Sequence, residues 1–267
     1  MKDCCIIISV YRTVPSENEI LSIERNLRVL KEYDVFFVHP FSLNTSAYES
    51  IITRLLSEEI KEGKNKAKLC TERIHFIPFK NKYFKSNKTY SRLLLSESFY
   101  RPFYDYEYML IAQTDTYILN TKDYSLNYFI DYSRNHSIDY WGAPWPNGPF
   151  YMPYSFKDRI KLLVVKEPSA IHVGNGGFSL RHILNSVRLI RKKQNLIDFF
   201  WRFNEDMFFS YFALTENCQF NSAPMEKARE FALETDMKTE LNAGNIPYAL
   251  HAFEKHLTRE ELLSFVK

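Results

Sequence analysis

Glycine is scarce in this chain, and long apolar runs are absent. Only 7 of the 267 residues are glycine, so a cluster of glycines needs an explanation. No stretch reaches the roughly 18 apolar residues that span a bilayer, which argues against a membrane-spanning helix. The apolar run at residues 4–10 is too short for a signal peptide, and polar residues follow it at once. We therefore expect a cytoplasmic protein, at most held at the inner face of the membrane.

Cysteine is also scarce, and the charge is nearly balanced. The four cysteines lack metal-ligand spacing, and Cys4 and Cys5 would point to opposite faces of a strand, so we interpret all four as reduced packing residues. A net charge of +3 is too small to indicate a nucleic-acid partner. It suits anionic small molecules or a lipid headgroup, so peripheral association with a membrane stays open.

Aromatic residues, in contrast, are abundant. They make up 16% of the chain, with 18 Tyr, 22 Phe and 3 Trp. Such residues line carbohydrate and nucleobase sites, although most of them must belong to the core. Because the chain has no internal repeat, low-complexity tract or Gly/Ser linker, we expect one domain with two lobes. The aromatic, proline-rich and irregular region at residues 140–156 would separate the lobes.

Buried strands and amphipathic helices alternate in the first half of the chain. The apolar patterns predict strands at residues 3–11, 34–39, 73–79 and 106–112, and helices at residues 19–32, 47–61 and 91–100. This order predicts a mostly parallel sheet whose ligands bind at the carboxyl ends of the strands. No G-x-G-x-x-G motif follows the first strand. Arg12 stands there instead, either facing a nucleotide or phosphate or as a surface arginine without a partner.

Three further features each have two interpretations. Residues 80–90 mix lysines with aromatic residues, as in a basic rim of a substrate cleft or in a solvated loop. Asp115 follows the expected strand at 106–112 and either holds a divalent cation that binds a diphosphate or caps a turn. His251 would complete that metal site, or it is an ordinary core histidine.

Three of the seven glycines gather at Gly174, Gly176 and Gly177, and Glu205 and Asp206 follow further on. Glycine lets a ligand approach the backbone closely, which predicts a binding loop, although the same residues also form ordinary turns. The adjacent acids are either active-site carboxylates or residues that stabilise a helix N-terminus. Together the two features indicate an active site.

Taken in order, these segments resemble the GT-A class of nucleotide-sugar glycosyltransferases, and most closely an uncharacterised glycosyltransferase-like domain family. The matching segments are residues 10–12, 111–115, 139–145, 174–181, 204–206 and 247–251, with Gln-Thr-Asp, Asn-Gly-Gly-Phe-Ser-Leu-Arg and Asn-Glu-Asp motifs among them. The resemblance implies an α/β, GT-A-like single domain over residues 1–267, with a mostly parallel central sheet flanked by helices and an acceptor-side lobe. Residues 1–120 would form the nucleotide-sugar-binding half and residues 121–267 the acceptor-side half.

The resemblance also implies roles for single residues. Asp206 would deprotonate the acceptor hydroxyl, and Glu205 would orient the acceptor. Asp115 and His251 would hold Mn²⁺ or Mg²⁺. Gln113 replaces the first acid of the Asp-x-Asp signature, so it can hydrogen-bond the donor but adds no charge. The expected donor-binding residues are Tyr11, Arg12, Gln113, Thr114, Asp115, Gly176 and Gly177.

The implied reaction transfers a sugar from a nucleoside-diphosphate sugar to a hydroxyl of a glycan, lipid-linked or protein acceptor, with inversion, in the synthesis of surface glycans or glycoconjugates. Trp141 and Trp145 would form a wall that stacks on the acceptor, unless they are a packed aromatic corner. A nucleotidyltransferase is a rival, but it normally needs a glycine-rich loop that residues 12–15 lack. A non-catalytic carbohydrate- or nucleotide-binding protein is the other alternative.

Overall fold

The computed structural model describes residues 1–61, 71–145, 172–214 and 218–267. Its central sheet has the strand order β3-β2-β1-β4-β7-β6. The strands are β1 (Lys2–Ser9), β2 (Asp34–Pro40), β3 (Ile74–Phe79), β4 (Tyr106–Ala112), β6 (Tyr140–Pro144) and β7 (Val173–His182). The first four run parallel, whereas β7 is antiparallel to both β4 and β6. The predicted α/β architecture with a mostly parallel sheet is therefore confirmed.

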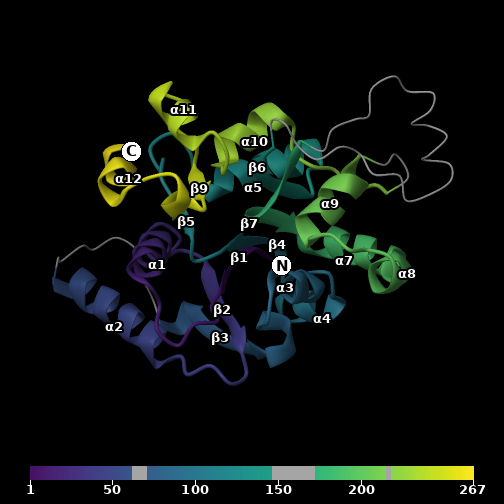
Figure 1. Ribbon diagram of the computed structural model, residues 1–267, viewed down its shortest axis with the longest axis horizontal. Coiled ribbons are helices and arrows are strands. Elements are labelled where there is room, and N and C mark those ends of the chain that lie inside the picture. Colours follow the sequence, from purple (N-terminus) through teal and green to yellow (C-terminus); the bar gives the residue numbers. More distant parts are fainter. Residues whose placement is uncertain (62–70, 146–171, 215–217) are drawn as a thin grey trace.

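Helices cover both faces of the sheet (Figure 1). The α-helices of the described residues are α1 (Glu17–Val29), α2 (Ser46–Lys61), α3 (Asn87–Leu94), α4 (Glu97–Tyr100), α5 (Leu126–His136), α7 (Ile183–Lys192), α8 (Gln194–Phe199), α9 (Glu205–Ala213), α10 (Met225–Phe231), α11 (Met237–Asn242) and α12 (Arg259–Ser264). Short 3₁₀ helices are η1 (Thr71–Arg73), η2 (Asn81–Phe84), η3 (Arg101–Phe103) and η4 (Phe253–Lys255). Within these ranges, no helix is long and apolar enough to cross a membrane.

The continuous apolar run of β1 results from burial on both faces. Ile6 and Ile8 pack in one core with α1, α2, α5 and α10, whereas Cys5 and Ile7 pack in a second core with α3, α4, α7 and α9. Cys4 lies in the first core, so the two adjacent cysteines are buried on opposite faces, as predicted. A strand covered on both sides has no polar face, which is typical of parallel sheets between helices.

The helix predicted at residues 91–100 is two helices. A capping box between Ser86 and Thr89 starts α3 at Asn87, before the apolar residues begin, and Leu95 and Ser96 separate it from α4. Apolar spacing marked the buried face but not the cap, because capping depends on side-chain hydrogen bonds to the backbone rather than on hydrophobicity.

A second, smaller sheet brings the end of the chain to the carboxyl end of β4. Its strand order is β5-β9-β8, formed by Thr116–Ile118, Ala249–His251 and Ala232–Leu233. In this sheet Thr116 of β5 pairs with His251 of β9. The register therefore places His251 beside Asp115, the residue just before β5.

Two sequence expectations about irregular segments are wrong. Residues 140–144 of the predicted irregular region form β6, and the rest of that region, apart from Trp145, lies outside the described residues. The strand was not predicted because it contains Gly142 and Pro144, and both residue types are unusual in strands. Gly142 is required because a Cβ there would lie 2.5 Å from the Asn175 carbonyl oxygen, and Pro144 occupies the irregular end of the pairing with β7.

The glycine cluster is not a loop, because Gly174, Gly176 and Gly177 all lie in the buried strand β7. Among the described glycines, Gly244 alone has a positive φ, so these three serve close packing rather than an unusual backbone conformation. β7 also joins the two halves that we predicted. It pairs with β4, so the central sheet includes residues from both sides of position 120.

Candidate functional site

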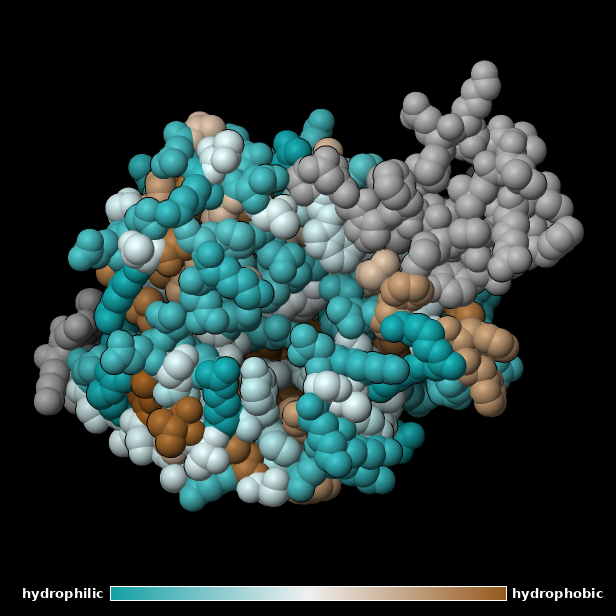
Figure 2. Space-filling model, viewed as in Figure 1, coloured by the Kyte–Doolittle hydropathy of each residue, from teal (hydrophilic) through white to brown (hydrophobic). Residues whose placement is uncertain are grey.

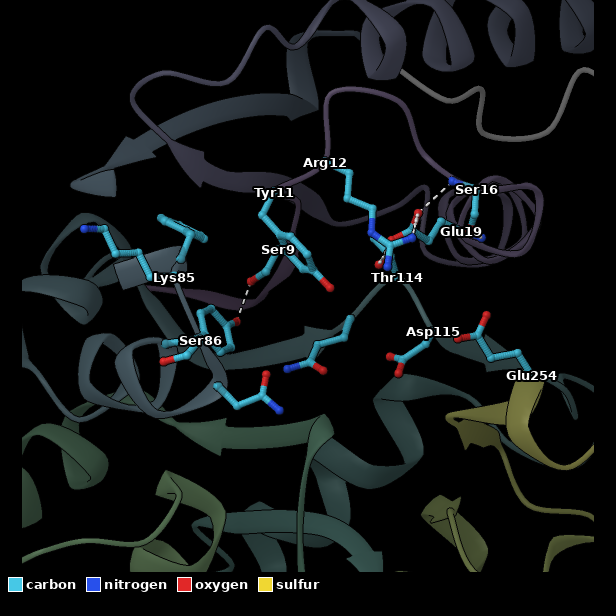
Figure 3. A pocket seen from close by; sticks show the side chains of 14 residues that line it. Ser9, Tyr11, Arg12, Ser16, Glu19, Lys85, Ser86, Thr114, Asp115 and Glu254 are labelled. Carbon is cyan, nitrogen blue, oxygen red and sulfur yellow. Dashed lines mark hydrogen bonds and ion pairs between the residues drawn. The ribbon is translucent and has the colours of Figure 1, made fainter. Parts of the chain in front are cut away.

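A pocket of about 260 Å³ opens at the carboxyl ends of β1 and β4 (Figure 3). Five of the predicted donor-binding residues line it: Tyr11, Arg12, Gln113, Thr114 and Asp115. Tyr11 and Arg12 follow β1 and the other three follow β4, two strands that are parallel neighbours. The parallel pairing explains why residues so distant in sequence share one pocket, since both strands end at the same edge of the sheet.

Glu19 organises one wall of the pocket. With Ser16 it forms a capping box at the start of α1, in which the Ser16 backbone N–H donates to Glu19 Oε2 at 2.7 Å. Thr114 Oγ1 donates to Glu19 Oε1 at 3.2 Å, and Arg12 Nη1 lies 3.6 Å from Glu19 Oε2. The sequence interpretation missed Glu19, although the Ser-x-x-Glu pattern at residues 16–19 is the usual sign of a capping box.

The opposite wall comes from residues 84–90. Phe84, Lys85 and Tyr90 line the pocket, and the Tyr90 and Ser9 hydroxyl oxygens are 2.5 Å apart. Burial raises the pKa of Tyr90, so its hydroxyl stays protonated and able to donate a hydrogen bond. Residues 84–90 thus form part of the rim of this pocket, but of the four lysines in residues 80–90 Lys85 alone lines it.

Asp115 and His251 meet at the edge of this pocket. His251 Nε2 lies 3.4 Å from Asp115 Oδ1, and His251 Nδ1 lies 3.4 Å from Glu234 Oε1. Burial alone would lower the pKa of His251, but contacts with the two carboxylates raise it to about 9. In the described part of the chain, neither Asp115 Oδ1 nor His251 Nδ1 has a hydrogen-bond partner of good geometry, although both atoms are buried.

This arrangement fits a divalent cation that is held partly by the donor. The described residues contain no group of three or more acidic, histidine or cysteine side chains that could hold a metal ion. Asp115 and His251 could supply one oxygen and one nitrogen ligand, and diphosphate oxygens and water would complete the coordination of Mn²⁺ or Mg²⁺.

Glu234 stands behind His251 and was not found from the sequence. It accepts a 2.5 Å hydrogen bond from Asn175 Nδ2, and Trp145 also hydrogen-bonds to it. Such a carboxylate orients the histidine ring and makes it a better ligand. No local pattern marks this role, because Glu234 follows the two-residue strand β8 and reaches His251 only through the small sheet.

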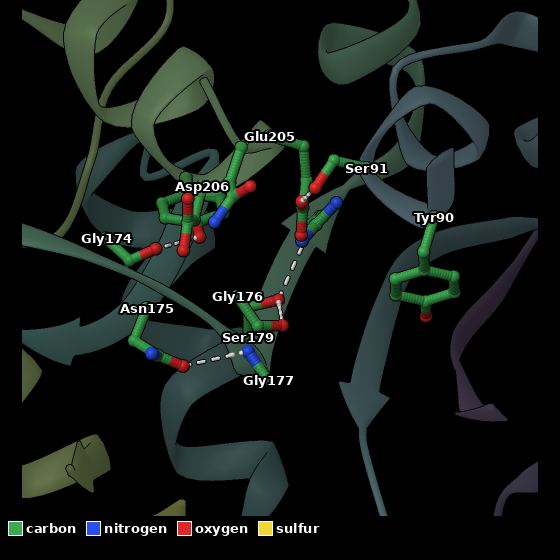
Figure 4. Close-up of polar contacts among 12 residues, drawn as sticks. Tyr90, Ser91, Gly174, Asn175, Gly176, Gly177, Ser179, Glu205 and Asp206 are labelled. Carbon is green, nitrogen blue, oxygen red and sulfur yellow. Dashed lines mark hydrogen bonds and ion pairs between the residues drawn. The ribbon is translucent and has the colours of Figure 1, made fainter. Parts of the chain in front are cut away.

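A second cluster lies around Glu205 and Asp206 at the start of α9 (Figure 4). Arg181 is completely buried, and its Nη2 lies 3.2 Å from Glu205 Oε1. Ser91 Oγ donates to Glu205 Oε2 at 2.6 Å. The Glu205 carboxylate thus already has a cation and a hydroxyl as partners, which a buried charge requires. Its orientation of an acceptor stays a prediction.

Asp206 differs from its neighbour because it is only half-buried. Burial, together with the negative charge of Glu205, raises the pKa of Asp206 to about 7, although hydrogen bonds from the backbone N–H groups of Met207 and Gly176 oppose the rise. The Met207 N–H donates to Asp206 Oδ1 at 2.6 Å. A carboxyl group with a pKa near neutrality can take up and release a proton under physiological conditions.

The adjacent glycines of β7 connect the two clusters. A Cβ on Gly176 would lie 2.6 Å from Glu205 Oε1, and a Cβ on Gly177 would lie 2.1 Å from His251 Nε2. Because neighbouring residues of a strand face opposite ways, the acidic pair and the Asp115 and His251 pair approach β7 from opposite sides. Contact of these glycines with a donor sugar stays a prediction, since neither lines the pocket.

The predicted acceptor wall is wrong for Trp141. Its side chain has no exposed surface, donates from Nε1 to Ser133 Oγ at 2.7 Å and packs against Phe129 and Phe231. The alternative, a packed aromatic corner, therefore holds for this residue. Trp145 is partly exposed, and its ring lies where a Gly174 side chain would stand. Its contact with an acceptor stays a prediction.

Three solved structures with a similar fold are glycosyltransferases. Mouse xyloside xylosyltransferase 1, in its apo form, has a TM-score of 0.54 and 11% identity, with 93% of this chain and 97% of that chain covered. The WbbM bifunctional glycosyltransferase has a TM-score of 0.52 and 13% identity, with 94% of this chain and 45% of that chain covered. LgtC in complex with donor and acceptor sugar analogs has a TM-score of 0.50 and 10% identity, with 92% of this chain and 86% of that chain covered. These likenesses confirm the predicted GT-A-like fold.

The chain belongs to a family described as "Protein of unknown function (DUF5672)", whose model matches residues 73–251. No curated protein matches the chain. The matched region includes β4, Asp115, the glycines of β7, Asp206 and His251. Both clusters described above therefore lie within the part of the chain that defines the family.

Proposed function

We propose that this protein is a glycosyltransferase that moves a sugar from a nucleoside-diphosphate sugar to an acceptor hydroxyl. The observation that carries the proposal is the meeting of Asp115 and His251 at the edge of a pocket that also contains Arg12. An arginine and a cation-binding pair at the carboxyl ends of parallel strands suit a diphosphate. The pocket thus supports a donor site in the half formed by residues 1–120.

On the donor side, each lining residue has a distinct task in this proposal. Tyr11, which is 55% exposed, presents a ring on which a nucleobase can stack. The Arg12 guanidinium binds phosphate oxygens, and Gln113 and Thr114 hydrogen-bond the ribose or sugar. Asp115 and His251 hold the divalent cation, which when bound would stabilise the charge that develops on the departing diphosphate.

On the acceptor side, Asp206 takes the proton from the attacking hydroxyl, and the sugar is transferred with inversion. Its raised pKa supports this role, because a base near pH 7 is ionised often enough to act and basic enough to accept a proton. Glu205 and Arg181 hold the start of α9 in place. Residues 121–267 would bind a glycan, lipid-linked or protein acceptor, for synthesis of surface glycans or glycoconjugates on the cytoplasmic side of a membrane.

The test is to incubate the protein with a panel of nucleotide sugars, with and without Mn²⁺, and to measure release of the nucleoside diphosphate. We expect release that depends on Mn²⁺ and rises when an acceptor is added. Asp131→Asn, which alters an exposed aspartate of α5, is the matched control for the site variants. Pyrophosphate formation from a nucleotide would instead indicate a nucleotidyltransferase, and binding without turnover would indicate a non-catalytic module.

A further inference from the structure

The surface formed by α7, α8 and the segment that leads to α9 combines exposed phenylalanines with basic residues. Phe199 and Phe200 are 65% and 67% exposed. Residues 188–202 contain five lysines and arginines and a single acid, Asp198. This segment therefore concentrates positive charge in a molecule whose net charge is only +3.

Phe199 and Phe200 face outward because the residues on either side of them are buried and hydrogen-bonded to the rest of the protein. Ile197 and Trp201, on either side of them in sequence, are buried, and Trp201 packs against Phe208 of α9. Arg92 of α3 donates hydrogen bonds to the backbone carbonyls of both Ile197 and Trp201. Exposure of Phe199 and Phe200 is thus a consequence of how the surrounding chain is anchored, since turning them inward would displace Ile197 and Trp201.

The positive charges at this surface are not all neutralised by the protein. Arg191 forms an ion pair with Glu97 at 2.6 Å, but among the described residues neither Arg188 nor Arg202 forms an ion pair. Arg188 donates to Asn185, and Arg202 donates to the Phe199 carbonyl oxygen, so neither guanidinium group is held by a carboxylate at ion-pair distance in the part of the chain that the structure describes. Figure 2 shows apolar side chains at the end of the molecule where Figure 1 places α8, beside hydrophilic ones.

We propose that this α7–α8 surface, defined by Arg188, Phe199, Phe200 and Arg202, docks the protein on an anionic lipid membrane. Aromatic side chains that enter the interface, beside arginines that face anionic headgroups, are the chemistry of peripheral membrane binding. Leu184 and Phe203, each 36% exposed, are the other large apolar side chains exposed on α7, α8 and the segment before α9, and this set is too small for the core of a stable protein interface. The surface of an anionic membrane can accept the phenylalanine side chains and bind the arginines at the same time.

Docking here would also bring the acceptor side close to the membrane. Asn204, which precedes α9, accepts a hydrogen bond from Trp201 Nε1 at 3.2 Å, and Asp206 follows two residues later. The anchored segment is therefore continuous with the helix start that carries the proposed base. This second statement rests on the proposed function, whereas membrane binding itself does not.

Sedimentation with lipid vesicles tests the proposal. We expect the full chain to sediment with vesicles of equal parts phosphatidylcholine and phosphatidylglycerol, to stay in solution with phosphatidylcholine alone, and to be released by high salt. The double variants Phe199→Ser/Phe200→Ser and Arg188→Glu/Arg202→Glu should each weaken binding about tenfold or more. Phe41→Ser is the matched control, because Phe41 is 63% exposed and follows β2, outside this surface.

Circular dichroism melting of each variant separates lost binding from lost folding. The proposal is overturned if the wild-type chain ignores the anionic vesicles, or if the phenylalanine variant is folded and binds as the wild type does. It is also overturned if Phe41→Ser loses binding equally, or if the phenylalanines instead mediate a dimer in solution. Release of nucleoside diphosphate without vesicles should be the same for all four proteins, so failure of docking and failure of the proposed reaction are distinguishable.

Discussion

At the scale of single residues, two neighbouring acids have opposite environments. Glu205 is buried but has Arg181 and Ser91 as partners, whereas Asp206 is only half-buried and feels the charge of Glu205. Burial is the main cause that raises the pKa of Asp206, and the like charge of Glu205 raises it further. The pair is thus divided into a carboxylate held by an ion pair with Arg181 and a carboxyl group whose pKa is raised to about 7.

Asp206→Asn should lower kcat about 100-fold or more while donor binding stays nearly unchanged, because general-base catalysis contributes factors of this size. In the wild type, the rate should rise with pH through about 7, where Asp206 becomes ionised, and then level off. Initial rates across pH, with Asp131→Asn as control, measure both effects. A near-normal rate for Asp206→Asn would remove Asp206 as the base and favour a retaining reaction.

The same substitution should stabilise the folded protein at alkaline pH. A carboxyl whose folded pKa is raised from 3.8 to about 7 binds more protons when folded, so its contribution to stability falls as pH rises between these values. Asn carries no charge and escapes this loss. Thermal melting should therefore show a higher Tm for Asp206→Asn than for wild type above about pH 7 and little difference near pH 4. Equal melting curves at alkaline pH would contradict the burial of this charge.

His251 should couple cation binding to pH. Because its pKa is raised to about 9, the ring is protonated at neutral pH, and a cation must displace that proton. In the presence of a nucleoside diphosphate, Mn²⁺ affinity measured by calorimetry should rise with pH up to about 9. Glu234→Gln removes one of the two carboxylates that stabilise the protonated ring, so the midpoint of this rise should move to lower pH.

The control for that experiment is Glu260→Gln, since Glu260 is exposed on α12. It should leave the pH dependence of Mn²⁺ binding unchanged. Affinity that is independent of pH in the wild type would exclude His251 as a ligand. An unchanged midpoint in Glu234→Gln would exclude Glu234 as the residue that positions it.

At the scale of secondary-structure elements, β7 serves as the partition between the two clusters. Its glycines remove side chains at the positions where Glu205 and His251 press against the strand. Hydrophobic alternation would ordinarily predict a strand, but the glycines at these positions predicted a binding loop instead. Glycine is required at these positions because Glu205 and His251, which lie far away in the sequence, pack closely against them.

Gly177→Ala should displace His251 and weaken Mn²⁺ binding in the presence of nucleotide about tenfold or more, because the new methyl group would overlap the imidazole ring. Gly244→Ala is the control. It meets no atom within 4 Å but has a φ of 86°, so it should cost about 1 kcal/mol of stability without affecting the cation. Normal Mn²⁺ affinity in a folded Gly177→Ala protein would show that His251 does not act from this position.

At the scale of the whole molecule, the central sheet unites the two predicted halves. β7 pairs with the edge of β4 that β1 leaves open. Residues of α7 and α9 complete the core on one face of the sheet. Residues 1–120 thus lack a finished core without residues 121–267. The division at residue 120 describes proposed tasks along the chain rather than separate folding units.

We therefore expect a fragment of residues 1–120 not to fold on its own, because it would expose the edge of β4 and the apolar face that α7 and α9 cover. The full chain should unfold in one cooperative transition. Circular dichroism and tryptophan fluorescence during urea denaturation measure this, and their curves should coincide. Two separate transitions, or a cooperatively melting fragment, would contradict the shared core.

Sequence alone determined β1 to β4, the helices α1 and α2, and which residues sit at the ends of β1 and β4, whereas it merged α3 with α4 and did not predict β5. These features depend on local hydrophobic patterns, and parallel strands place their ends together. The family resemblance implied one donor site for Tyr11, Arg12, Gln113, Thr114 and Asp115, and the structure places all five in one pocket.

Tertiary structure decided what depends on distant contacts. The contact of Glu234 with His251 exists only because the small sheet brings β8 and β9 together. The burial of Trp141 results from the pairing of β6 with β7 and from the helices that cover it. The need for glycines in β7 likewise depends on distant contacts. Their close packing against His251 and Glu205 produces no periodic pattern in the sequence. Local sequence encodes which side chains an element offers, but the three-dimensional fold sets which of them meet, since those contacts join residues far apart in the chain.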